Sequence, residues 1–114
     1  MFLFQIHQEN FESLLKRDGT HQNDVERKAM FYLFASNSEI MARIEGLYDF
    51  RERVICVEEN SKGTLSSGTR ALVNLGYNLY NNYSSPSVLD IFRNLDDKNF
   101  ELAMRGIQIR FGKG

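Results

Sequence analysis

Four side chains in this sequence are of types that bind transition metals. His7 and Cys56 offer a nitrogen and a sulfur, and Asp24 and Asp49 offer carboxylate oxygens that could complete a four-coordinate zinc site. We expect His7 and Asp24 to open two helices, and Asp49 and Cys56 to lie in a later connector. Because ligands from separate segments can meet at the ends of elements, the pattern allows a metal site.

Three of these residues also have ordinary structural explanations, and the pattern favours these. Asp24 is suited to cap a helix, Asp49 could bond to backbone amides, and a lone cysteine such as Cys56 is commonly a small buried apolar residue. The sequence contains no glycine-rich phosphate loop, no His-Glu-x-x-His, no Gly-x-Ser-x-Gly and no acidic calcium loop. We therefore expect no enzyme, with a metal-dependent enzyme or small metal-binding protein as the alternative.

Apolar residues recur with helical spacing through most of the chain, so the elements that position these side chains are predicted to be helices. The one run typical of a strand is residues 54–57, for which we expect an extended connector or a single short strand. Six short helices with short connections predict an all-α bundle that forms one domain over residues 1–114. The helices are expected near residues 10–18, 24–34, 38–47, 67–81, 86–95 and 97–111.

Two helix starts and one helix face are predicted in detail. Ser85 and Pro86 resemble a cap followed by a proline in the first helical position. Asp96 is expected to cap the last helix. Apolar residues at helical spacing predict the buried stripe of that last helix: Phe100, Ala103, Met104, Ile107 and Phe111.

Composition and charge exclude several classes of protein. The chain has 114 residues, 42% hydrophobic and 25% charged, which is typical of a globular domain and not of a disordered tail. Its net charge of −1 is far from that of a basic DNA-binding protein or an acidic DNA mimic, so we expect no direct nucleic-acid binding. No stretch approaches the roughly 18 apolar residues that span a bilayer, and no signal peptide is recognisable, so we expect a cytoplasmic protein without a membrane partner.

Two short segments could contact a protein partner. The run from Tyr77 to Tyr83 holds three tyrosines and three asparagines, and tyrosine offers a rigid ring with a polar tip. From this run we select Tyr80 and Asn81. The acidic pair Glu58 and Glu59 precedes a polar loop and could meet a basic surface. The alternative is a packed helix end for the first segment and a solvated pair for the second.

Four phrases of the sequence resemble a small uncharacterised family of low-GC Gram-positive bacteria, carried by phages, prophages and conjugative elements. The phrases are Asp24-Val25-Glu26-Arg27-Lys28-Ala29-Met30-Phe31-Tyr32, Ile44 to Phe50, Leu75-Gly76-Tyr77-Asn78-Leu79-Tyr80-Asn81 and Ile107-Gln108-Ile109-Arg110-Phe111. The resemblance covers nearly the whole chain. It implies that His7, Asp24 and Asp49 are the family positions most consistent with a metal site, whereas the stretch around Cys56 is the least family-like. A bound Zn²⁺ would be structural, because a compact domain gains stability from such a clamp.

The resemblance also implies a biological setting. Small proteins of mobile elements often inhibit host defences, and similar cargo includes anti-CRISPR proteins that act on type II effector nucleases. We therefore expect a mobile-element inhibitor that works by stoichiometric binding to a host protein, such as a guide-loaded CRISPR nuclease. Because the net charge is near zero, we expect a shaped surface and not an imitation of phosphates.

Overall fold

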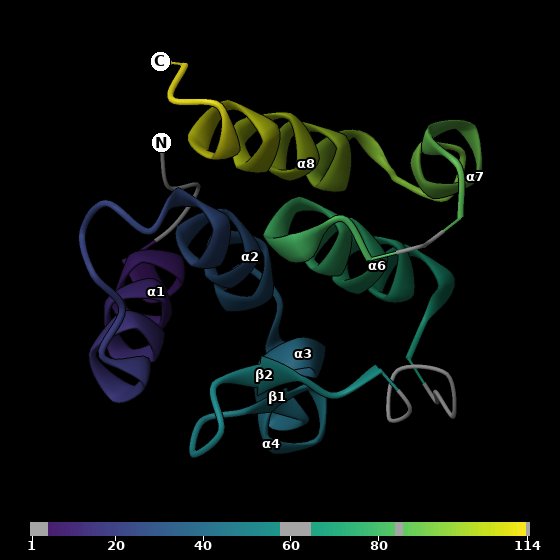
Figure 1. The fold of residues 1–114 in the computed structure, drawn as a ribbon. Coiled ribbons are helices and arrows are strands. Elements are labelled where there is room, and N and C mark those ends of the chain that lie inside the picture. Colours follow the sequence, from purple (N-terminus) through teal and green to yellow (C-terminus); the bar gives the residue numbers. More distant parts are fainter. Residues whose placement is uncertain (1–4, 58–64, 84–85, 114) are drawn as a thin grey trace.

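The computed structural model describes residues 5–57, 65–83 and 86–113 of the chain. In these ranges seven helices and two short strands follow one another (Figure 1). The fold is therefore mostly α-helical, as the apolar spacing predicts. The elements are α1 (Gln5–Asp18), α2 (Val25–Ala35), α3 (Ser38–Ala42), α4 (Ile44–Leu47), β1 (Tyr48–Asp49), β2 (Val54–Ile55), α6 (Ser67–Asn81), α7 (Val88–Phe92) and α8 (Asp97–Arg110).

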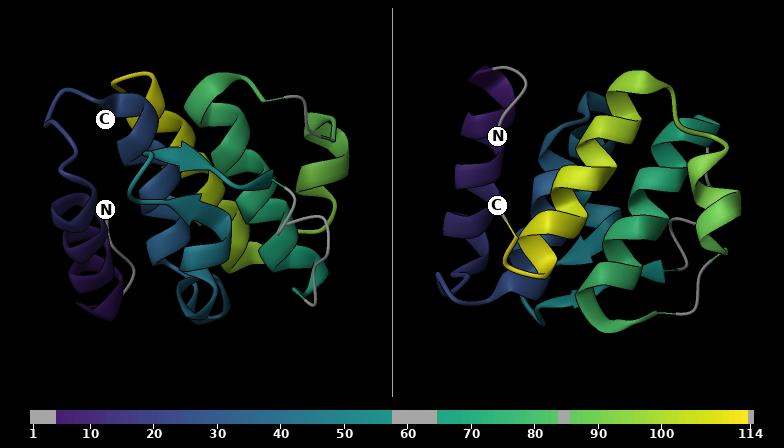
Figure 2. Two further views of the ribbon diagram at one scale, coloured as in Figure 1. Left: turned by 60° about the horizontal axis from the view of Figure 1, so that its bottom comes forward. Right: turned by 90° about the horizontal axis from the view of Figure 1, so that it is seen from above.

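Helix α2 is the centre of the core. Every residue from 29 to 35 is fully buried, because α1, α6 and α8 pack around it and α3 follows directly. Figure 1 shows α1 and α6 on opposite sides of α2, with α8 across the top, and Figure 2 shows α8 and the β1–β2 hairpin on opposite sides of the molecule. The sequence predicts this central position from the wide apolar surface of the segment.

Two glycines allow α6 and α8 to lie close to α2. A Cβ atom on Gly76 of α6 would lie 2.9 Å from Cε1 of Phe34, and a Cβ on Gly106 of α8 would lie 3.0 Å from Cδ2 of Leu33. Both distances are shorter than ordinary carbon–carbon contacts, which begin near 3.5 Å. Because glycine has no side chain, these two positions allow α6 and α8 to pack closely against α2.

Side-chain caps fix where most helices begin. In each of these caps the side chain accepts a hydrogen bond from the backbone N–H three residues on, which satisfies a donor that the first turn leaves open. The predicted caps at Asp24 and Asp96 are confirmed. The predicted start at Ser85 and Pro86 is wrong: α7 begins at Val88, and Ser87 caps it after the proline, while Ser85 lies outside the described residues. The capping residues are Asp24, Asn37, Ser66, Ser87 and Asp96.

The sequence prediction of one unpaired strand is wrong. Strand β2 pairs antiparallel with β1, so that Tyr48 lies opposite Ile55 and Asp49 opposite Val54. Its partner strand is made by Tyr48 and Asp49, which directly follow α4. A two-residue strand is too short to show the alternation of apolar and polar residues that marks a strand in a sequence. The pairing also depends on the turn between the strands.

The prediction of which side of the last helix faces the core is also wrong. Leu102, Ala103 and Gly106 are the buried residues of α8, whereas Phe100, Met104 and Phe111 of the predicted stripe are exposed. Only Ala103 belongs to both sets. Among residues 5–57, 65–83 and 86–113, none of the helices combines the length and the apolar character needed to cross a membrane.

Candidate protein-binding surface

The structure places His7, the first predicted metal ligand, in the interior. It is fully buried beside Tyr32, with ring centroids 4.5 Å apart, and its Nε2 lies 2.9 Å from the Tyr32 carbonyl oxygen. Because a carbonyl only accepts, Nε2 carries the proton and donates. Burial lowers the pKa of His7, so that the imidazole is neutral at pH 7.

The two predicted carboxylate ligands bond to backbone amides. Asp24 Oδ1 accepts the N–H of Arg27 at 3.0 Å and its Oδ2 accepts Arg27 Nη1 at 2.8 Å. Asp49 Oδ1 accepts the backbone N–H groups of Arg51 and Glu52, both at 2.9 Å. Each carboxylate thus stabilises a local turn or helix start.

Cys56 follows β2 and is half-buried. Its N–H donates to Leu47 O at 3.0 Å, and its carbonyl accepts the hydroxyl of Tyr77 at 3.2 Å. The part of the chain that the structure describes contains no group of three or more His, Cys, Asp and Glu side chains that could hold a metal ion. The metal site made of His7, Asp24, Asp49 and Cys56 stays a prediction.

Of the predicted partner contacts, Tyr80 and Asn81 lie at the end of α6. Tyr80 is half-buried and its hydroxyl accepts Arg27 Nη2 at 3.0 Å, whereas Asn81 is exposed. Glu58 and Glu59 lie outside the described residues. Tyr80 is therefore committed to an intramolecular contact that the sequence did not indicate.

That contact belongs to a cluster of six side chains, which we call the arginine cluster: Asp18, Asp24, Arg27, Tyr48, Arg53 and Tyr80. Besides its bonds to Asp24 and Tyr80, Arg27 donates from Nε to the Tyr48 hydroxyl at 3.1 Å and from Nη2 to the carbonyl of Arg53 at 3.0 Å. The cluster joins the ends of α1 and α6, the start of α2 and the hairpin.

Asp18 is the buried carboxylate of the arginine cluster. It accepts the hydroxyl of Tyr48 at 2.6 Å, Arg53 Nε at 3.1 Å and Arg53 Nη2 at 2.9 Å, and also the hydroxyl of Thr20. Burial alone would raise the pKa of Asp18, but the bonds from Arg53, Thr20 and Tyr48 outweigh it and hold the pKa below its usual value.

Burial and the bond to Asp18 raise the pKa of Tyr48. At neutral pH Asp18 is therefore charged and Tyr48 is protonated. The arginine cluster thus combines charged arginines and aspartates with neutral tyrosine hydroxyls, and their bonds hold the hairpin in place. Sequence reasoning missed it because no spacing links residues that lie so far apart in the chain.

Of the eight large apolar residues that are exposed in the described part of the chain, five lie on α7 and α8 or directly after α8. The exposed fractions are 73% for Val88, 67% for Leu89, 48% for Phe100, 40% for Met104 and 63% for Phe111. Phe92 is half-buried and connects the two helices, since its ring centroid lies 5.6 Å from that of Phe100. We call these six residues the α7–α8 apolar surface. Contiguous exposed apolar surface of this kind commonly marks a site that another molecule covers.

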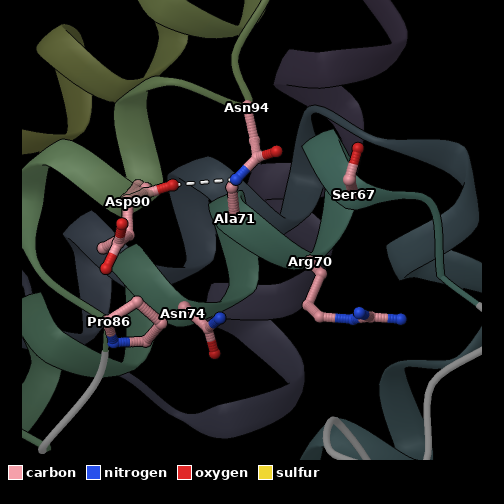
Figure 3. A pocket seen from close by; sticks show the side chains of 8 residues that line it. Ser67, Arg70, Ala71, Asn74, Pro86, Asp90 and Asn94 are labelled. Carbon is pink, nitrogen blue, oxygen red and sulfur yellow. Dashed lines mark hydrogen bonds between the residues drawn. The ribbon is translucent and has the colours of Figure 1, made fainter.

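A polar cavity of about 290 Å³ lies on the other side of α7, between α7 and α6. Figure 3 shows Asp90 of α7 and Asn94, which follows that helix, across from Ser67, Arg70 and Asn74 of α6. The amide of Asn94 donates to the carbonyl of Asp90 at 2.8 Å. Ile91 lines the same cavity and is buried, so it anchors α7 while Val88 and Leu89 of the same helix stay exposed.

The chain belongs to a family of unknown function (DUF6075), which it matches over residues 1–114. No curated protein and no solved structure matches it. Since the function of the family is unknown, the chemistry of the chain's own surfaces is the basis for assigning one.

Proposed function

We propose that the protein is a non-enzymatic binding domain that acts by stoichiometric contact with another protein through the α7–α8 apolar surface. The observation that carries the proposal is the exposure of Val88, Leu89, Phe100, Met104 and Phe111 on two neighbouring helices. Each of these side chains is already partly covered, so burying the rest of one contributes on the order of 1 kcal/mol, and several together are needed to offset the cost of association.

Exposed charges of both signs lie on or next to the same two helices and could set specificity. Arg93 and Asp90 of α7 lie 3.6 Å apart, and Arg105 of α8 donates to Glu101 at 3.1 Å. All four side chains are substantially exposed, so these pairs contribute little to the stability of the fold and can exchange for pairs with a partner. An apolar centre with a polar rim is the usual anatomy of a protein interface.

The resemblance to proteins of mobile elements supports a host defence protein as the partner, with a guide-loaded CRISPR nuclease as the first candidate. In this proposal the protein occupies a nuclease surface that must otherwise receive guide or target nucleic acid. The contact would be apolar and shaped, since the net charge of the protein is −1.

Capture from a host lysate supplemented with guide-loaded nuclease, read by mass spectrometry, tests the proposal. We expect one partner in near-stoichiometric amount with the wild-type protein, and its loss with Leu89→Glu or Phe100→Glu. Val54→Glu is the matched control, because Val54 is an exposed apolar residue of β2, on the opposite side of the molecule from α8 (Figure 2). Equal capture by all variants would contradict the assignment of this surface.

A second pair of substitutions tests the acidic segment that the sequence indicates. Reversing both charges in E58K/E59K weakens capture if Glu58 and Glu59 contact a basic partner surface. Unchanged capture would remove these residues from the interface and leave the α7–α8 apolar surface as the binding site.

A further inference from the structure

Helix α8 has apolar residues on two sides, of which only one faces the core. The core side is Leu102, Ala103 and Gly106, packed against α2 and α6. The second side carries Phe100, Met104, Ile107 and Phe111, which we call the outer stripe. Ile107 lies at its inner edge, half-buried and packed against the core. A helix that is apolar on both sides is normally covered on both.

The outer stripe has the spacing of a helix-pairing seam. Its residues follow one another at intervals of four, three and four, which is the a/d repeat by which two helices pack side by side. Phe100, Met104 and Phe111 are exposed and Ile107 is half-buried, so the stripe runs along the whole of α8. The fitting occupant is therefore another helix with an apolar stripe of similar length.

The charges of α8 indicate which helix that is. Glu101 and Arg105, in the middle of the helix, pair with each other. The N-terminal end carries Asp96 and Asp97 against Lys98, a net charge of −1, and the C-terminal end carries Arg110 and Lys113, a net charge of +2. A second α8 laid antiparallel brings the acidic part of each copy near the basic part of the other. Parallel copies would place like charges together.

We propose that a second copy of this chain covers the outer stripe, with the two α8 helices antiparallel about a two-fold axis. This rests on the proposed function, which identifies the α7–α8 apolar surface as a binding surface. Because the dimer covers its α8 residues, the dimer must dissociate before a host protein contacts Phe100. The axis passes between Met104 and Ile107, which places Phe100 beside the partner subunit's Phe111. One self-complementary patch on each copy satisfies the requirement of a two-fold dimer.

The small area that two α8 helices can bury limits the stability of the dimer. A helix of 14 residues is about 21 Å long, so two such helices alone bury less than the roughly 1,600 Å² of a standard interface. We therefore expect a dimer in equilibrium with monomer, whose population rises with protein concentration.

Sedimentation velocity of the full chain, from about 1 µM to about 1 mM, measures this equilibrium. We expect a concentration-dependent shift from monomer to dimer in the wild type, and at least about a tenfold weaker dimer in Met104→Glu. Leu89→Glu is the matched control: Leu89 is at least as exposed, lies on α7 outside the outer stripe, and its substitution should leave the dimer intact. Phe111→Ser, at the end of α8, serves as a second disruptive variant if circular dichroism shows that M104E is unfolded.

Charge reversal tests the antiparallel orientation separately. D97K places a lysine in the acidic part and K113E places a glutamate in the basic part, and each should weaken the dimer about two- to fivefold. The double variant D97K/K113E restores opposite charges across the axis and should regain the wild-type affinity. Additive weakening in the double variant would overturn the antiparallel arrangement.

The two proposals fail in different ways. A wild type that stays monomeric at the highest concentration overturns the dimer, as does a dimer that M104E leaves intact. Capture of a host protein that depends on Leu89 would still support the proposed function in either case. A dimer that captures no host protein would support the dimer and contradict the host-binding role.

Discussion

Arg53 holds the buried carboxylate of Asp18 with two hydrogen bonds, although its own backbone is in the left-handed region. Arg53 Nε lies 3.1 Å from Asp18 Oδ1 and Nη2 lies 2.9 Å from Oδ2, while the φ of Arg53 is +59°. A left-handed conformation costs a residue other than glycine about 1–2 kcal/mol. The two bonds offset this cost, so the turn between β1 and β2 is held in place by a contact to the end of α1.

Replacing Arg53 by two small residues separates these two effects. Arg53→Ala keeps the backbone strain and removes both bonds, so we expect the free energy of unfolding to fall by about 1–3 kcal/mol. Arg53→Gly also removes the bonds but relieves the strain, so its loss should be smaller by about 1 kcal/mol. Urea denaturation of the two variants measures the difference. Equal losses would show that the backbone at residue 53 is not strained.

The buried His7 makes stability depend on pH. Burial lowers the pKa of His7 from 6.5. The charge of Lys98 lowers this pKa further, whereas the bond to Tyr32 raises it by less than burial lowers it. The unfolded chain therefore takes up a proton at higher pH than the folded chain. The contribution of neutral His7 is fully present above about pH 6.5 and is lost as the pH falls through the lower folded value.

Denaturation at pH 7, 6 and 5 tests this dependence. His7→Gln retains a donor for the carbonyl of Tyr32 but cannot take up a proton in this range, so the unfolding free energy of H7Q should fall less with decreasing pH. His21→Gln is the matched control, because His21 is exposed and its ring accepts the local N–H of Asn23 at 3.0 Å. If the unfolding free energies of H7Q and the wild type fell equally with decreasing pH, His7 would not be the group that makes stability depend on pH.

A methyl group at Gly76 should disturb the packing of α6 on α2. Because the added carbon would lie 2.9 Å from the Phe34 ring, we expect Gly76→Ala to lower the unfolding free energy by about 1–3 kcal/mol. Phe34→Leu removes the ring atom in question. The double variant G76A/F34L should then be more stable than the sum of the single losses predicts, and strict additivity in this cycle would contradict the close contact.

The helices that the sequence predicts well are those whose signals are local. Asp24 caps α2 with a side chain three residues from the amide it accepts, and the apolar run after it identifies the core helix. Gly19 ends α1 with a φ of +72°, as the Asp18-Gly19 pair indicates. Neither conclusion needs knowledge of where another segment lies.

Residues whose roles depend on distant segments could not be predicted. The bonds of Arg27 to Tyr48 and Tyr80 join positions 21 and 53 residues away, and no spacing rule connects them. The buried side of α8 was predicted wrongly because the helix is apolar on two sides, so that helical periodicity alone cannot distinguish the core side from the outer stripe.

Truncating two apolar residues of α7 should have very different effects on the free energy of unfolding. Ile91 is 4% exposed and faces α6, so Ile91→Ala removes buried methyl groups and should cost about 2–5 kcal/mol of unfolding free energy. Leu89 is exposed on the same helix, so Leu89→Ala should change that free energy by less than about 0.5 kcal/mol. Urea denaturation of both variants, followed by partner capture, separates stability from binding. A large loss of stability in L89A would mean that this chain covers Leu89 itself, and the α7–α8 apolar surface would then be part of the core.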